Sequence, residues 1–186
     1  MSYNLLKGKR GIIFGALNDQ SIAWKVAERA VERRCKYYII KYSDGYPYGR
    51  SRRFGPEIKL PGYSGRCHQC RRFAKCIQDL HGYTGWTNWF LYSTLWYVSQ
   101  RAQKKRTYDD LDYGMLDKTL DISAVSFHKM IQSAKKLNAI ADYGSIVALS
   151  YVAAQRTFYG YNDMADAKAF VGVYCSQLRL HLWTRT

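Results

Sequence analysis

The sequence has no apolar run long enough to cross a lipid bilayer, which takes about 20 consecutive residues. Its most apolar stretch, WFLYSTLWYV at 89–98, falls well short of that length. The beginning of the chain, MSYNLLKGKRGIIFG, lacks the apolar stretch and cleavage site of a secretory signal peptide. The five cysteines are an odd number for a disulfide framework. We therefore expect no membrane partner and a cytoplasmic protein with reduced thiols.

Acidic residues are scarce, with 14 Asp and Glu against 29 Lys and Arg and a net charge of +15. Taken alone, this charge favours a polyanionic partner such as a nucleic acid. The imbalance is uneven, because residues 35–103 hold 11 Lys and Arg against 3 Asp and Glu. The length of 186 residues and the hydrophobic content of 47% indicate one globular domain with a real core.

A zinc site needs more ligands than the segment GRCHQCRRFAKC at 65–76 supplies. Cys67 and Cys70 form a C-x2-C with His68 inside it, but beyond it only Cys76 and His81 are near, and no second ligand pair follows. We therefore expect no metal site. The alternative is a basic zinc- or nucleic-acid-binding protein, because basic and aromatic residues together are typical of single-strand binding.

The flanks of the basic segment show an α/β pattern. KRGIIF at 9–14 is a short apolar run that ends at Gly15, which predicts a buried parallel strand. Ser21 can cap a following helix. The apolar residues of that helix recur every four positions: Ile22, Val26 and Ala30. A strand, a glycine turn and a helix N-terminus can bind an anion. The usual G-x-G-x-x-G is absent, so spacing alone leaves an ordinary βα turn open.

Further elements are predicted after residue 104. TYDD at 107–110 is a possible capping box. A long helix ending near Asn138 has one apolar face, formed by Leu120, Ala124, Phe127, Ile131 and Ala134. GSIVALS at 144–150 predicts a second buried strand.

Tyr161 and Lys168 are seven residues apart, which is two turns of a helix, so both side chains can point the same way. A Tyr beside a Lys ammonium is a suitable proton donor, because the cation favours the phenolate. The alternative is a surface Tyr and a solvated Lys.

Two long segments, KGKRGIIFGALNDQSIAWKVAERA and KKRTYDDLDYGM…GSIVALSYVAAQRTFYGYNDMADAKA, closely resemble the NADH-dependent enoyl-[acyl-carrier-protein] reductases of bacterial fatty-acid synthesis. These belong to the short-chain dehydrogenase/reductase superfamily. The resemblance covers 1–34 and 104–169 and includes Ser-Ile-Ala after the glycine turn and Tyr-x6-Lys. Ordinary members of the superfamily use Tyr-x3-Lys, which would place the Tyr at Met164. The resemblance implies an α/β fold with a Rossmann-like, doubly wound parallel sheet of order 3-2-1-4-5-6-7.

The resemblance also implies roles for individual residues in NADH binding. Gly15, Ser21 and Ile22 would contact the diphosphate region of NADH. Lys168 would hold the nicotinamide ribose hydroxyls.

For catalysis, the resemblance implies that Tyr161 donates a hydrogen bond to the thioester carbonyl as hydride reaches the β-carbon. Tyr151 matches a second active-site Tyr of the family, and Tyr159 does not fit the spacing. The implied partners are an enoyl-acyl-carrier-protein substrate and three further copies in a homotetramer, without nucleic acid.

The middle of the chain shows no pattern for the second, third and fourth strands of the family. A shifted frame joins the last two bases of one codon to the first base of the next. In that frame, GYSGRCHQCRRF at 62–73 can encode VIPADATSVDDL, which resembles the family at its third strand. In the same frame, other stretches can also encode sequences typical of an α/β protein: ITLLNTPMAIRMG at 37–49, QSVFKTSMDILG at 74–85, GMSPNVRK at 97–104 and LLESIARSFGY at 170–180. Long consecutive matches are hard to assign to chance.

We therefore interpret 36–104 and 170–186 as out-of-frame translations of a reductase gene. The chain would be one truncated Rossmann-type domain, with a first βα unit at 1–35 and a helix, strand and Tyr/Lys segment at 105–169. Its first and fifth strands would lose their shared neighbours, and the sixth and seventh strands would lie beyond the end. Buried strands with unpaired edges are an aggregation hazard. We expect the chain as written to be inactive and to bind NADH weakly or not at all.

Overall fold

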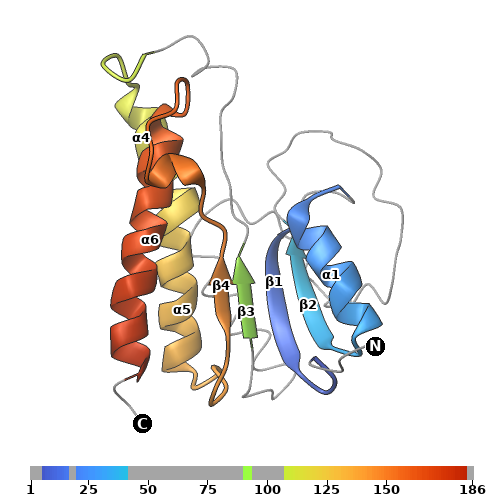
Figure 1. Ribbon diagram of the computed structural model, residues 1–186. Helices are drawn as coiled ribbons and strands as arrows, with labels where there is room; N and C mark the ends of the chain where they lie inside the picture. The colour runs from blue at the N-terminus through green and yellow to red at the C-terminus, as the bar shows by residue number, and fades with distance from the viewer. Residues whose placement is uncertain (1–5, 17–19, 42–89, 94–106, 184–186) are drawn as a thin grey trace. The chain divides into compact units, whose positions relative to one another are not determined.

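The fold is known from a computed structural model, which describes residues 6–16, 20–41, 90–93 and 107–183 (Figure 1). The chain forms two compact units. The first comprises Met1–Thr94 and Gln132–Val147, and the second comprises Leu95–Ile131 and Ala148–Thr186. The described elements are, in chain order, β1 (Arg10–Ala16), α1 (Ile22–Glu32), β2 (Lys36–Lys41), β3 (Phe90–Ser93), α4 (Tyr113–Leu120), a π-helical turn (Asp121–Val125), α5 (Ser126–Lys136), β4 (Ile146–Ala148), a 3-10 turn (Val152–Ala154) and α6 (Asn162–Trp183).

The described strands form one sheet of order β2-β1-β3-β4. β1 lies inside it and pairs in parallel with both neighbours, so that Gly11 is opposite Tyr37 on one side and Phe90 on the other. The side chains of Ile12 and Ile13 in β1, which lie on opposite faces of the sheet, are both fully buried. A central parallel strand buried on both faces is typical of an α/β fold, so the predicted strand at 9–14 and the predicted fold class are confirmed.

The expectation that the sheet loses its second and fourth strands is wrong. β2 and β3 both come from the written sequence between 36 and 104, and β3 lies between β1 and β4 in the sheet order. The strand sequences KYYIIK and FLYS are rich in aromatic and β-branched residues, which favour a pleated strand. Strand pairing uses backbone groups, so a short run of such residues can supply a strand whatever its origin.

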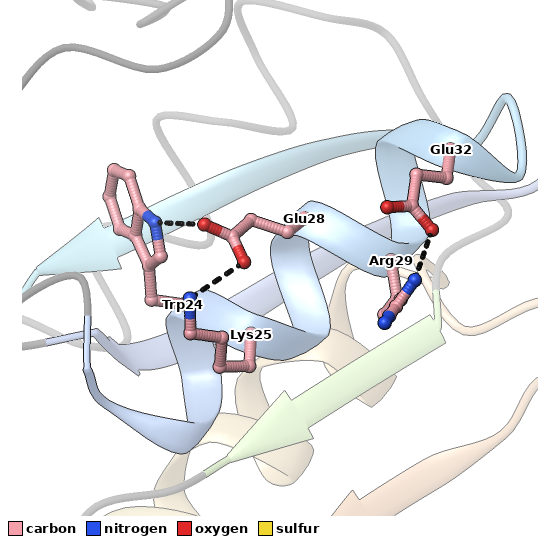
Figure 2. A network of polar contacts seen from close by, with 5 residues as sticks. All are labelled: Trp24, Lys25, Glu28, Arg29 and Glu32. Carbon is pink, nitrogen blue, oxygen red and sulfur yellow. Dashed lines mark hydrogen bonds and ion pairs between the residues drawn. The ribbon is translucent and has the colours of Figure 1, made fainter.

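Helix α1 contacts β1 and β2 through a face of small residues and one Trp: Ala23, Trp24, Ala27 and Ala30. The predicted stripe was therefore right at Ala30 and wrong at Ile22, which is exposed. Trp24 Nε1 donates to Glu28 Oε1 at 3.0 Å, and the other oxygen of Glu28 accepts from Lys25 Nζ at 2.9 Å (Figure 2). Exposed ion pairs contribute less than about 1 kcal/mol each, so packing, rather than these pairs, holds the helix.

The predicted long helix exists, but it is divided. Helix α4 begins after Asp112, whose Oδ1 accepts from the backbone N–H of Met115 at 3.2 Å. The predicted capping box at 107–110 is therefore wrong, and Thr107 starts a turn closed by its carbonyl and the N–H of Asp110. A π-helical turn then separates α4 from α5. Four of the five residues of the predicted apolar face are buried: Ala124, Phe127, Ile131 and Ala134.

The strand predicted at 144–150 is confirmed only for Ile146–Ala148, and it is not fully buried. Val147 is 46% exposed, and β4 ends the described sheet order. An end strand has a neighbour on one side only, which explains the exposure.

The C-terminal helix α6 runs without a break through residue 170, where the frame is predicted to shift. Before that point it buries Met164, Ala167 and Lys168. After that point Val171 alone is buried among the described side chains, whereas Phe170, Val173 and Leu180 are about half exposed.

The cysteine segment at 65–76 and His81 lie outside the described residues. Cys35 and Cys175 are free thiols, the first buried and the second exposed. Within the described ranges, each helix is too short or too polar to traverse a bilayer.

Candidate active site

The end of β1 contains a glycine in the left-handed region of backbone conformation. Gly15 has a φ of +88°, and the pairing register with β2 shifts between Phe14 and Ala16. Only glycine adopts that conformation without steric cost, and such bulges re-aim the chain at sheet ends.

Ser21 is the N-cap residue of α1, and its carbonyl accepts from the N–H of Lys25 at 3.1 Å. The predicted cap position is therefore confirmed, although the Ser21 side chain makes no capping hydrogen bond to the described helix. Ile22, the first helical residue, is 55% exposed. The first N–H groups of α1 have no intrahelical partner, and the helix dipole favours an anion beside them. Ser21 and Ile22 therefore stand at a helix N-terminus, where an anion is favoured.

Tyr151 and Tyr161 lie together in the second unit. Their rings are stacked with centroids 4.9 Å apart, and Phe158 lies with its ring centroid 6.3 Å from that of Tyr161. A hydrogen bond with the Tyr161 side chain raises the pKa of Tyr151. Tyr159, in contrast, is 97% exposed.

Tyr161 lies immediately before α6 rather than within it. Its carbonyl accepts from the N–H of Ala165 at 3.0 Å, which is the first hydrogen bond of the helix, and α6 itself begins at Asn162. The position of the Tyr161 backbone is therefore set by the first turn of α6.

Lys168 is a buried residue, and the alternative of a solvated Lys is wrong. Its side chain lies two turns into α6, and Nζ donates to the backbone carbonyl of Leu149 at 2.9 Å. Burial disfavours the charged form and lowers the pKa of Lys168 to about 8. The carbonyl lies just after β4, so the end of that strand orients the amine.

Sequence reasoning missed one buried polar pair. Thr119 Oγ1, at the end of α4, donates to Asp163 Oδ2, in the first turn of α6, at 2.6 Å. Both residues are at most 1% exposed. An acidic residue in the first turn of a helix is a visible signal, but its partner 44 residues earlier is not.

The predicted site residues divide between the two units. Gly15, Ser21 and Ile22 belong to the first unit, and Tyr151, Tyr161 and Lys168 to the second. Within the second unit the structure brings Tyr151 and Tyr161 into contact.

A parallel sheet, a glycine near the end of a strand that leads to a helix, and a buried Lys in a helix that follows a Tyr are together typical of one class of protein. That class is the short-chain dehydrogenase/reductase superfamily, with its Rossmann-like fold. The sequence profile described as enoyl-(acyl carrier protein) reductase matches residues 15–182, and the chain belongs to this family.

Individual relatives agree with the family assignment. The chain is 30% identical over 172 residues to the NADH-dependent enoyl-[acyl-carrier-protein] reductase FabI of Rickettsia bellii, covering 91% of this chain and 63% of that protein. It is 26% identical over 185 residues to the corresponding enzyme 1 of Rhizobium meliloti, covering 97% and 65%. The crystal structure of the FabI–NADH complex from Alistipes finegoldii superimposes with a TM-score of 0.77 and 45% identity, over 95% of this chain and 62% of that one.

The chain thus spans less than two thirds of the length of these relatives.

Proposed function

We propose that this chain derives from an enzyme that reduces a trans-2-enoyl thioester of acyl carrier protein with NADH, in bacterial fatty-acid synthesis. The observation that carries the proposal is the stacked Tyr151–Tyr161 pair at the start of the helix that buries Lys168. We place the enzyme in the cytoplasm as a homotetramer, following the family resemblance.

Tyr161 is the proposed proton-bearing group of this site. Its hydroxyl donates a hydrogen bond to the thioester carbonyl oxygen and stabilises the negative charge that develops there. The stacked ring of Tyr151 restricts the orientation of Tyr161, and the hydrogen bond between the two side chains fixes its hydroxyl. A group oriented before the reaction loses little entropy during it.

NADH, when bound, supplies the hydride to the β-carbon. Gly15, Ser21 and Ile22 are the residues we assign to its diphosphate, because their backbone suits an anion. Lys168 is assigned to the ribose hydroxyls, since its amine is a donor held at a fixed position by Leu149.

We further propose that residues 36–104 and 170–186 are translated out of frame, and α6 supports this for the tail. Among the described side chains after residue 170, only Val171 is buried, and Tyr174 and Leu178 are half-buried. The ring centroids of Tyr174 and His128 are 5.2 Å apart. The shifted frame puts Leu, Ile and Phe at positions 171, 174 and 178, which is one helical face. It puts Glu, Ser, Arg and Ser at the exposed positions 172, 173, 176 and 177.

The decisive assay compares two proteins by oxidation of NADH at 340 nm with a trans-2-enoyl thioester. One is the chain as written, and the other is the frame-restored gene expressed to its own stop codon. We expect reductase activity from the restored protein and none from the written chain. An inactive, folded restored protein would contradict the proposed reaction, whereas a fully active written chain would contradict the frame breaks alone.

The same two proteins test the alternative of a basic zinc- or nucleic-acid-binding protein. One zinc ion per written chain, with DNA binding that falls steeply with salt, would favour that alternative.

A further inference from the structure

The first turn of α6 is the part of the second unit on which Tyr161 depends. The first four N–H groups of a helix lack intrahelical acceptors, and helix ends fray for that reason. Tyr161 is the cap of this turn, and its carbonyl accepts the first helical hydrogen bond from Ala165. A catalytic side chain placed there needs a contact from outside the helix to keep it still.

Asp163 and Thr119 provide that contact. Asp163 lies two residues after Tyr161, and its side chain is 1% exposed. Thr119 Oγ1 donates to it at 2.6 Å from the last turn of α4, across 44 residues of sequence. A buried polar group must be hydrogen-bonded, because its desolvation is otherwise uncompensated. The pair therefore fixes the distance between α4 and the first turn of α6.

A second hydrogen bond from outside the helix lies one turn further along α6. The hydroxyl of Tyr108 donates to Asp166 Oδ1 at 3.1 Å, but both groups are in contact with solvent. Exposed hydrogen bonds compete with water and restrain little. The buried contact at Asp163 is thus the stronger restraint on the turn that carries Tyr161.

We propose that Thr119 is a positioning residue for Tyr161 and acts through Asp163. Its role in the reaction rests on the proposed function above. The geometric part does not, because it concerns where the Tyr161 ring lies against Tyr151.

The test uses the chain with ¹³Cζ-labelled tyrosine, observed by NMR, with Tyr161 assigned through Tyr161→Phe. Thr119→Val removes the hydroxyl and keeps the shape, and Thr119→Ser restores a hydroxyl. Ser126→Ala is the matched control. The buried Ser126 Oγ also donates a 2.6 Å hydrogen bond, but its acceptor is the backbone carbonyl of Ile122 and not a residue of α6. We expect Thr119→Val to move the Tyr161 resonance toward that of exposed Tyr159, and Thr119→Ser and Ser126→Ala to leave it in place.

Kinetics of the same variants in the frame-restored enzyme supply the second measurement. Misplacing a catalytic group lowers the rate of the chemical step, so kcat should fall about tenfold to a hundredfold in Thr119→Val, with KM within about twofold. Asp163→Asn keeps the volume and an acceptor, and it should give a smaller effect of the same kind.

Two variants, Thr119→Val and Asp163→Asn, are available in case one of them does not fold. The proposal is overturned if the Tyr161 resonance of a folded variant is the same as in the unsubstituted chain. If the unsubstituted enzyme reduces no enoyl thioester, the proposed function fails, but the resonance still decides whether Thr119 positions Tyr161.

Discussion

At the scale of residues, three tyrosines lie close together in the sequence of the second unit, and their surroundings differ. Tyr159 is almost fully exposed, whereas Tyr161 is stacked on Tyr151 and lies immediately before α6. The sequence predicts the choice of Tyr161 through its spacing from Lys168. It does not reveal Thr119 or Leu149 as partners, because those contacts depend on how distant segments pack.

Replacing Tyr161 tests the proposed proton-bearing group. In the frame-restored enzyme, Tyr161→Phe should lower kcat by about a hundredfold to a thousandfold, because one donor to the developing negative charge is lost. The ring and its stacking on Tyr151 are kept, so the fold should be unaffected. Steady-state kinetics give the result, and Tyr159→Phe is the control, since it removes an exposed hydroxyl. Equal effects of the two substitutions would argue against Tyr161.

The buried amine of Lys168 should make stability depend on pH. Its pKa is about 8 in the folded chain, against 10.5 for an ordinary Lys. Between these values the unfolded state binds more protons, so the free energy of unfolding rises with pH across this window. The gain reaches at most about 3 kcal/mol by pH 10.5 and is absent below pH 8.

Urea unfolding of the chain and of Lys168→Met between pH 7 and 10.5 measures this contribution. We expect the free energy of unfolding of the unsubstituted chain to increase with pH relative to that of Lys168→Met. A difference that stays constant with pH would show that Lys168 is solvated.

At the scale of elements, helix α6 has two unlike halves. Its first half buries residues with defined contacts, and its second half exposes apolar side chains such as Phe170 and Val173. The helical residues after 170 were not predicted from the written sequence, because that segment was interpreted as an out-of-frame translation. The helix continues because helix formation propagates from an existing turn at little cost.

Exchanging residues 170–178 for the shifted-frame text LLESIARSF should stabilise the chain by about 1–2 kcal/mol. Most of the gain comes from Gly172→Glu, since glycine costs about 1 kcal/mol inside a helix, and a Cβ there meets no atom within 4 Å. Urea unfolding followed by circular dichroism measures it. A control tail of the same composition, with polar residues at 171, 174 and 178, should destabilise the chain instead. If both tails behave alike, the burial pattern of α6 carries no information about the frame.

Other helices show why the ends and buried faces of an element were harder to predict than its type. The stripe in α1 was misjudged because Ala23 and Ala27 are small enough to lie against the sheet, which leaves Ile22 free to face solvent. The cap of α4 was misplaced because Thr107 and Asp112 are both good cap residues. The π-helical turn at Asp121–Val125 has no sequence signature that separates it from an α-helix.

At the scale of the whole molecule, the parallel sheet and the family were predictable from the segments at 1–34 and 104–169. The presence of β2 and β3 was not, because the prediction weighed family patterns and neglected the strand propensity of KYYIIK and FLYS. A sheet that keeps these strands weakens the argument that a broken sheet makes the chain inactive. The proposed out-of-frame translation would still change the side chains at every position that it affects.

The most direct measurement is peptide mapping by mass spectrometry of the protein isolated from its natural source. The account predicts a peptide containing VIPADATSVDDL in place of the written GYSGRCHQCRRF at 62–73. That result would identify the natural protein as an in-frame member of the reductase family. Peptides that cover GRCHQCRRF as written would contradict the account and show that the basic cysteine segment is part of the real protein.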